Sequence, residues 1–397
     1  MKRYLGDKVH HVAAQTEWDH FVIVPSAEDK VETIGRSRFY HVKSLPLVGS
    51  LSYRMLLNRQ KILSILGQEK PDLIEVGDPY RSAWIGLEAA TRFQIPIIAF
   101  YHSDFPRALG RTIQRFCGRA IESNLSRLVN RYIVGLYNRM TATVVAGQRM
   151  EQVLTGCGIH NVVRIPLGTD PSQFKPNPLG AASIRNQLGL SSQDTLLIFV
   201  GRLAREKNIR SLLGMMDCLA QTPSYRYHLL LVGDGELRHL VEPAAAQRHD
   251  ITWYRYTEST DHLTACYTAA DLFVHAGQYE TFGITSLEAQ ACGTRVLAIR
   301  SGGLDDTVEG ESPSILAASP NPEELAACVR LAQNADQPNA AALRRERILA
   351  RFTTERLFVN LFTLYQSIIE ENSIEPFRRI QTESVQSNLD RETLLTR

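Results

Sequence analysis

The chain has 397 residues, 44% of them hydrophobic, and a formal net charge of only +2 at pH 7. A chain of this length and composition supports two domains of ordinary size, each with a core of its own. The small net charge argues against a nucleic-acid-binding protein that depends on overall positive charge.

The six cysteines are scattered, with no CxxC pair and no histidine at metal-ligand spacing from them. This predicts reduced thiols, with neither a zinc site nor a disulfide framework. No run of about 18 apolar residues is present, and the first twenty residues lack the apolar core of a signal peptide. We therefore expect a cytoplasmic protein.

Short apolar runs alternate with helical patterns along the chain. They predict buried parallel strands at 21–24, 73–76, 97–100, 142–146, 196–200, 229–232, 272–275 and 295–298. Helices are predicted between them, for example at 54–68 and 209–219. Continuous apolar strands separated by helices are typical of a sheet that is covered on both faces.

A stretch rich in proline and glycine, IPLGTDPSQFKP at 165–176, predicts the domain boundary. We expect two Rossmann-like domains at 1–165 and 166–350, a helix at 351–372 that crosses back over both, and a polar tail at 373–397. Two such domains that face each other form a cleft between the carboxyl ends of their sheets, where these folds bind ligands.

Two glutamates lie near the predicted start of a helix that follows the seventh strand. Gly283 is placed at the junction, so the backbone N–H groups of Gly283, Ile284 and Thr285 should point at an anion such as a pyrophosphate. Glu280, before the helix, can meet sugar hydroxyls, and Glu288, inside it, can reach a ribose diol. Taken alone, the two glutamates would be interpreted as unrelated loop and surface acids.

Two more segments of the same half give these glutamates a context. Arg202 and Lys207 follow a strand in a loop that enters a helix, and two fixed cations suit a diphosphate leaving group. The segment LVGDG, ending at Gly235, places two glycines in a tight turn after the next strand. Each signal is weak alone, but their order on consecutive strand–helix units favours a shared site.

The segments VGRLAREKN, LVGDGEL and ETFGITSLEAQACGT resemble the retaining glycosyltransferases of family 4. The stretches YTAADLFVHAG, SGGLDDTV and IPLGTDPSQFKP fit the same pattern, and the resemblance is strongest over 160–370. It implies an α/β architecture of the GT-B type. It also implies transfer of a hexose of the mannose or glucose type from a nucleotide sugar, without a metal or other cofactor.

The resemblance further implies roles for single residues. Arg202 and Lys207 would neutralise the departing diphosphate, Glu280 would act catalytically by holding the donor sugar, and Glu288 would hold the ribose. The implied donor-binding residues are Arg202, Lys207, Gly235, Phe282, Gly283, Ile284 and Glu288.

The segment YHSDFP after the strand at 97–100 resembles family members that transfer mannose or glucose to lipids or glycolipids. We expect His102 to be catalytic, near the anomeric carbon, with a purely structural histidine as the alternative. Asp104 and Tyr80 are expected on the acceptor side, which would take a lipid or a glycan.

Family members begin with a strand and a glycine-rich loop, whereas this chain opens in what resembles their first helix. A missing first strand would leave a gap in the N-terminal sheet with exposed edges. Two explanations stay open: the true start lies upstream of Met1, or the chain is a truncated relative. The second explanation corresponds to a second hypothesis, a non-catalytic relative that binds nucleotide sugars. A third hypothesis, a sugar-nucleotide epimerase or a phosphorylase, is weaker. The phosphorylase would need a lysine context for pyridoxal phosphate, which the sequence does not show.

Eight arginines and a single acid, Glu122, lie between residues 105 and 149. The first four recur every four residues: Arg107, Arg111, Arg115 and Arg119. A solvated helix face and a surface that rests on anionic lipid headgroups are both compatible with this pattern. The second interpretation predicts a protein bound peripherally to the inner membrane face.

Overall fold

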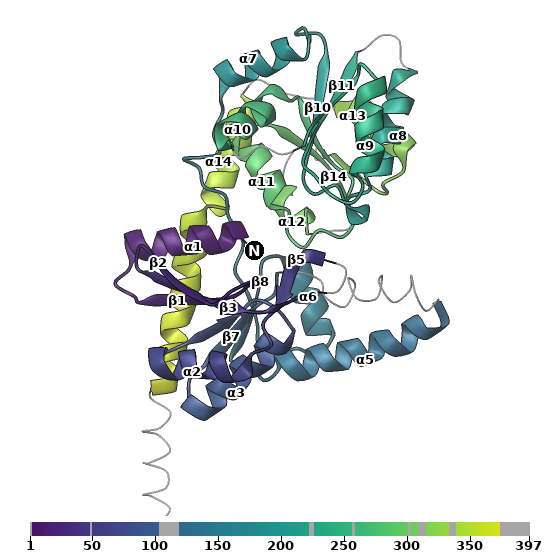
Figure 1. The fold of residues 1–397 in the computed structure, drawn as a ribbon. Coiled ribbons are helices and arrows are strands. Elements are labelled where there is room, and N and C mark those ends of the chain that lie inside the picture. Colours follow the sequence, from purple (N-terminus) through teal and green to yellow (C-terminus); the bar gives the residue numbers. More distant parts are fainter. Residues whose placement is uncertain are drawn as a thin grey trace, which may run out of the picture. The chain divides into compact units, whose positions relative to one another are not determined.

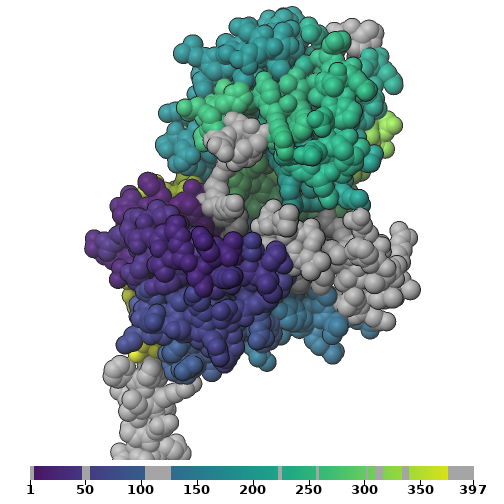
Figure 2. Space-filling view, in the orientation of Figure 1, coloured from purple at the N-terminus to yellow at the C-terminus, as the bar shows by residue number. Residues whose placement is uncertain are grey.

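The computed structural model describes residues 2–47, 50–102, 119–221, 226–255, 259–300, 303–308, 315–332 and 339–373. The chain divides into two compact units (Figure 1). The first unit comprises residues 1–145, 151–165 and 358–397, and the second comprises 146–150 and 166–357. Figure 2 shows the purple and dark-blue surface of the first unit and the green surface of the second.

A parallel sheet of six strands forms the centre of the second unit, in the order β12-β11-β10-β13-β14-β15. Its strands are β10 (Thr195–Val200), β11 (Tyr227–Val232), β12 (Ile251–Tyr254), β13 (Leu272–His275), β14 (Arg295–Ile299) and β15 (Ile315–Ala317). In chain order, β11 and β12 lie on one side of β10, and β13, β14 and β15 then follow on its other side. The neighbouring strands β10 and β13 are therefore its topological switch point.

Helices cover both faces of this sheet (Figure 1). One face carries α7 (Pro178–Gln187), α10 (Thr260–Ala269), α11 (Ile284–Ala291) and α14 (Ala340–Arg351), and the other carries α8 (Ile209–Ala220), α9 (Arg238–Gln247) and α13 (Pro322–Ala332). Along β10, Leu196 and Ile198 enter one core while Leu197 and Phe199 enter the other. Successive side chains of a strand point to opposite faces, so a strand buried on both sides is apolar throughout.

The first unit holds a four-stranded parallel sheet and two smaller ones. The larger sheet consists of β6 (Ile74–Val76), β7 (Ile97–Phe100), β8 (Ala142–Val145) and β9 (Val162–Arg164), in chain order. A second sheet has the order β1-β3-β2, made of β1 (His20–Ser26), β2 (Lys30–Ile34) and β3 (Ser37–Lys43), and β4 (Leu45–Leu47) pairs with β5 (Ser50–Met55). The helices are α1 (Lys2–Gln15), α2 (Arg59–Glu69), α3 (Arg81–Phe93), α5 (Arg119–Tyr137) and α6 (Gln148–Gly156), with a further helix at 354–373.

All eight predicted strands are present, and two details differ from the predictions. Arg54 belongs to β5, and α2 begins only at Arg59, where the Asn58 side chain caps the helix by accepting the N–H of Lys61 at 3.2 Å. Strand β1 was predicted to be buried but is half-buried, and it lies at the edge of its sheet, paired with β3. Among the described strands, none joins β1 to β6.

A buried polar network holds three distant segments of the first unit together. Lys8 of α1 donates hydrogen bonds to Glu75 of β6 and to the hydroxyl of Tyr365, both at 2.8 Å. Tyr365, in the helix at 354–373, also donates to Glu75, and Tyr4 donates to the same carboxylate at 3.2 Å. Because Lys8 is only 5% exposed, these partners take the place of water around its ammonium group.

None of the helices in the described ranges is both long enough and apolar enough to cross a membrane.

Candidate active site

Two loops of opposite charge leave the second sheet at its switch point. The loop after β10 carries Arg202 and ends in the short 3-10 helix η1 (Arg205–Lys207). The loop after β13 carries Glu280 and leads into α11. Open parallel sheets bind ligands outside the carboxyl ends of their strands at the switch point, so this position marks both loops as a candidate site.

Lys207, Glu280 and His275 form a charged cluster in these loops. The Lys207 ammonium contacts Glu280 Oε2, and His275 Nε2 lies 3.3 Å from the same oxygen and 3.4 Å from Lys207 Nζ. The side chain of His275 is 1% exposed and that of Glu280 19%. Burial acts to raise the pKa of Glu280, but the hydrogen bond from His275 and the charge of Lys207 outweigh it and hold the pKa well below its usual range. The carboxylate is therefore ionised at neutral pH.

The basic loop is fixed to the end of β13. Asn208 adopts a left-handed backbone conformation with φ of 51° and starts α8 directly after η1. Its side chain donates a hydrogen bond to the carbonyl oxygen of Ala276 at 2.8 Å. Lys207 therefore reaches Glu280 from a loop whose path is set by backbone geometry and by this bond.

The turn between Glu280 and α11 depends on Gly283, which has φ of +86° and forms the N-cap of the helix. A Cβ there would lie 2.3 Å from Cδ2 of Leu304, so a side chain would be strained and would also collide. The N–H of Gly303 donates to the carbonyl oxygen of Glu280 at 2.8 Å, and Phe282 is 1% exposed. These contacts fix the path of the turn before the N-terminus of α11 at Ile284, which is a candidate position for an anion.

Glu288 lies inside α11, and its side chain is buried, with 1% exposure. Its Oε2 accepts a hydrogen bond of 2.9 Å from the hydroxyl of Tyr267 on α10, which is also buried. Tyr267, which the sequence analysis did not single out, therefore holds the side chain of Glu288, the residue predicted to bind the ribose.

Arg202 does not join the cluster. It pairs instead with Glu206 at 2.6 Å, and its side chain is 63% exposed.

Gly235 follows β11, in a turn that is hydrogen-bonded to the basic loop. There the backbone N–H of Leu203 donates to the carbonyl oxygen of Asp234 at 3.0 Å, and the N–H of Leu237 donates to the carbonyl oxygen of Leu203 at 2.9 Å. The turn after β11 thus supports the basic loop from its other side.

The predicted residues of the first unit follow two neighbouring strands. His102, after β7, stacks on Phe100 with ring centroids 4.2 Å apart and meets the ring of Tyr4 at 4.9 Å. Burial lowers the pKa of His102 to about 4, against the opposing charge of Glu75, so the imidazole is neutral at pH 7. Tyr80, after β6, is half-exposed at the start of α3. Asp104 lies outside the described residues.

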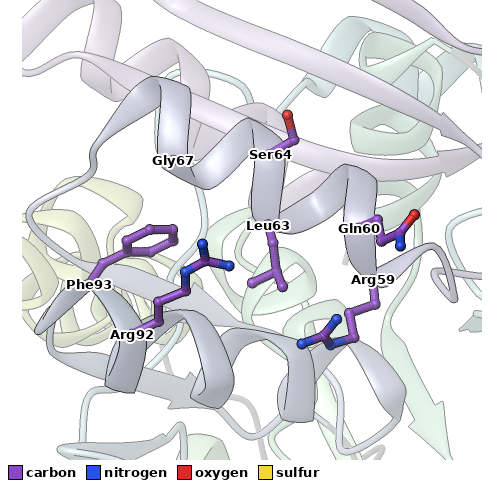
Figure 3. A pocket seen from close by; sticks show the side chains of 7 residues that line it. All are labelled: Arg59, Gln60, Leu63, Ser64, Gly67, Arg92 and Phe93. Atoms are coloured by element: carbon purple, nitrogen blue, oxygen red, sulfur yellow. The ribbon is translucent and has the colours of Figure 1, made fainter.

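A groove of about 380 Å³ also lies between α2 and α3 in the first unit (Figure 3). Arg59 on its wall is paired with Glu88, and Arg92 packs over the ring of Phe93 at 5.5 Å. The groove runs between two helices and does not include a strand end. We therefore do not regard it as the candidate site.

The sequence-based hypothesis omitted His275 from the site. The signal was nevertheless present, because His275 is the last residue of a predicted apolar strand, at the carboxyl end where ligands bind. A polar residue that closes such a strand is a candidate even when no motif names it.

Comparisons with known proteins agree with this geometry. The model described as Glycosyltransferase Family 4 matches residues 3–173, and the model described as Glycosyl transferases group 1 matches residues 181–346. A GDP-mannose-dependent alpha-mannosyltransferase of Mycobacterium tuberculosis is 30% identical over 290 residues, which cover 72% of this chain and 68% of that protein. The chain belongs to glycosyltransferase family 4.

Solved structures show the fold of this family 4 chain. Sucrose-phosphate synthase from Thermosynechococcus elongatus matches it with a TM-score of 0.72 and 23% identity, over 93% of both chains. HepE of Anabaena, in complex with UDP-glucose, matches with a TM-score of 0.61 and 22% identity, over 78% of this chain and 82% of that one. The predicted GT-B fold is confirmed. The predicted enzyme class, a glycosyltransferase that uses a nucleotide sugar, is confirmed as well.

Proposed function

We propose that this glycosyltransferase moves a hexose from a GDP- or UDP-activated sugar to an acceptor, with retention at the anomeric carbon. The cluster of Lys207, Glu280 and His275 at the switch point, beside the N-terminus of α11, is the observation that carries the proposal. The name of the mycobacterial relative specifies GDP-mannose, and the Anabaena protein was solved with UDP-glucose. These two donors are therefore the first to test.

In this proposal the chain supplies the charges that a diphosphate leaving group needs. Lys207 and Arg202 neutralise the diphosphate, and the first N–H groups of α11 receive one of its oxygens. The ionised Glu280 accepts hydrogen bonds from the sugar hydroxyls, and Glu288 accepts one from the ribose. Fixed charges are most effective where water is excluded. Because cations of the chain fill this role, we expect activity without a divalent metal ion.

The acceptor side is assigned to the first unit. His102 is neutral at pH 7, so it can orient an acceptor hydroxyl or hold a hydroxyl of the donor sugar. Tyr80 follows the neighbouring strand and is half-exposed, which suits contact with an acceptor. Asp104 keeps its predicted place beside His102 in the proposal, although it lies outside the described residues.

A lipid acceptor and peripheral attachment to an anionic membrane form the finer part of the proposal. On α5, Arg127 and Arg131 are exposed, Leu128 is 60% exposed and Tyr132 is 37% exposed. The indole of Trp84 donates a hydrogen bond to the Tyr132 hydroxyl at 3.0 Å. Basic, aromatic and apolar side chains on one surface suit a layer of lipid headgroups. The arginines Arg107, Arg111 and Arg115, and the side chain of Arg119, lie outside the described part.

The direct experiment incubates the purified protein with GDP-mannose, UDP-glucose and other nucleotide sugars, with and without a membrane lipid extract and with and without EDTA. We expect one donor to release its nucleoside diphosphate and to label a lipid, with EDTA having little effect. The matched control is Glu280→Gln, which keeps the size of the side chain and removes its charge. Equal release by the wild type and by Glu280→Gln from every donor would contradict the proposal.

A further inference from the structure

His275 is a polar side chain in an apolar setting. It closes β13, pairs with Ala298 of β14, and lies 6.4 and 6.2 Å, between ring centroids, from Phe199 and Phe273. Burying an imidazole without hydrogen bonds would cost free energy of folding. The hydrogen-bond partners of His275 are therefore the evidence for its role. Both ring nitrogens are in contact: Nε2 lies 3.3 Å from Oε2 of Glu280, and Nδ1 lies 3.3 Å from the backbone nitrogen of Gly277.

These contacts assign the tautomer. The backbone N–H of Gly277 can only donate, so Nδ1 accepts and carries no proton. Burial lowers the pKa of His275 and favours the neutral ring, whose single proton is then on Nε2. That proton is donated to Glu280. Lys207 lies 3.4 Å from Nε2 and donates to the same carboxylate oxygen, because a protonated Nε2 cannot accept.

The backbone after β13 fixes the ring in this orientation. A Cβ on Gly277 would lie 2.7 Å from Cε1 of His275 and 3.1 Å from the carbonyl oxygen of Glu206. Only glycine therefore lets the chain approach the edge of the ring closely enough to donate to Nδ1.

We infer that His275 is a positioning residue, which holds the Glu280 carboxylate toward the donor sugar by donating a hydrogen bond from Nε2. The inference rests on the proposed role of Glu280 in binding the sugar. Lys207 and His275 both donate to Oε2 of Glu280 and so fix the orientation of the carboxylate. Neither of them occupies the other oxygen, Oε1, which the inference assigns to the donor sugar. In the described part of the chain, Lys207 from η1 and His275 from β13 are the groups whose charge or hydrogen bond acts on its ionisation.

Two substitutions separate this role from simple packing. In His275→Gln the amide nitrogen reaches the place of Nε2 and can still donate to Glu280. In His275→Asn the shorter side chain reaches only the place of Nδ1, so it can accept from Gly277 but cannot reach Glu280. Urea unfolding at pH 7 identifies any variant that fails to fold.

Hydrolysis of GDP-mannose and of UDP-glucose is measured from pH 4 to pH 9 for both variants. We expect His275→Asn to lose about 10-fold or more in rate and to move the acid limb of the profile upward by about one pH unit. His275→Gln should stay within about 3-fold of the wild type, because it keeps the donor to Glu280. Equal profiles for the two variants would show that His275 only fills the core, and would overturn the inference.

A readout without substrate separates this inference from the proposed function. The folded pKa of Glu280 lies below its ordinary value of 4.5, so its stabilising effect is present above that pH and is lost as the pH falls further. The decline in unfolding free energy below pH 4.5 should be smaller in His275→Asn than in His275→Gln. Wild-type turnover in Glu280→Gln would contradict the proposed function, and with it the part of the inference that concerns the sugar. Identical pH dependence of stability in both His275 variants would contradict the hydrogen bond from His275 to Glu280 and leave the proposed function standing.

Discussion

Lys207 is held by a carboxylate although its proposed partner is a diphosphate. A half-buried ion pair adds little net stability, since the loss of hydration of both charges offsets most of their attraction. In the proposed function, the Lys207–Glu280 pair consists of two binding groups that hold each other in place before the donor binds. A donor would share the ammonium between Glu280 and a phosphate oxygen, and would find both charges already oriented.

This interpretation leads to a prediction for the basic loop. Lys207→Ala should weaken binding of GDP or UDP about 10-fold, and Arg202→Ala should weaken it less, because Arg202 is more exposed. Both effects should decrease as salt is added. Titration calorimetry measures them. The control is Arg205→Ala, because Arg205 lies in the same loop, is similarly exposed and paired with a glutamate, and has no role in the proposed binding of the diphosphate. An unchanged dissociation constant in the Lys207→Ala/Arg202→Ala variant would exclude the proposed role.

Among the elements, those buried on both faces were the easiest to predict. Strands β10, β11, β13 and β14 have continuous apolar sequences because helices cover both sides of their sheet. Strand β2 was missed because it is mostly exposed and polar, and β12 is short and partly exposed. Strand β2 forms because it pairs with β3, and its sequence has no apolar pattern that would have predicted it.

The site residues that could be predicted from the sequence were those that lie in motifs after buried strands. Lys207 follows β10 and Glu280 follows β13, two strands that are separated in the chain but are neighbours at the switch point of the sheet, where the two side chains come into contact. Tyr267 was missed because its contact with Glu288 depends on how α10 packs against α11. His275 was missed although its contacts with Gly277 and Glu280 are local, because the motifs from which the site residues were assigned do not include it. Arg202 was expected beside Lys207, but a partner four residues further along the chain holds it elsewhere.

At the scale of elements, the network that ties α1 and the helix at 354–373 to β6 gives a stability prediction. Lys8→Met should lower the unfolding free energy by about 3–5 kcal/mol, because it leaves the Glu75 carboxylate buried without its cation. Adding Glu75→Gln to Lys8→Met should restore part of the loss. Urea unfolding followed by circular dichroism measures both. A double variant no more stable than Lys8→Met would contradict the pairing.

This network also has a pH dependence. Burial acts to raise the pKa of Glu75, but the charge of Lys8 and the hydrogen bonds from Lys8 and Tyr365 outweigh it and keep the pKa below its ordinary value of 4.5. Its contribution is therefore present above that pH and is lost as the pH falls through the lower, folded value. From pH 7 to pH 4 the wild type should lose more stability than Glu75→Gln. Parallel curves for the two proteins would show that Glu75 is not held in this way.

For the whole molecule, the small net charge of +2 conceals a concentration of arginines in the first unit. We expect the protein to sediment with vesicles that contain anionic lipid, and less so with neutral vesicles or at high salt. A basic residue close to such a surface contributes about 1 kcal/mol. Replacing the four arginines that recur every four residues by glutamine should release the protein while nucleotide binding is kept: Arg107, Arg111, Arg115 and Arg119.

Within the described residues, Arg127→Gln/Arg131→Gln tests the same surface on α5. The charge-matched control is Arg210→Gln/Arg238→Gln, which removes two exposed arginines from the second unit. Weaker sedimentation of the α5 variant alone supports membrane contact through α5. Equal sedimentation of both variants, or equal binding to neutral and anionic vesicles, would mean that the arginines are only a solvated helix face.

The most direct test of the proposed site compares the turnover of a nucleotide sugar by the wild type and by Glu280→Gln, with the affinity for GDP and UDP measured on the same samples. If Glu280 holds the donor sugar at the switch point, turnover should fall about 100-fold or more, while the dissociation constant of the nucleoside diphosphate should change only a few-fold. Wild-type turnover in a folded Glu280→Gln protein would contradict the assignment of this cluster as the active site.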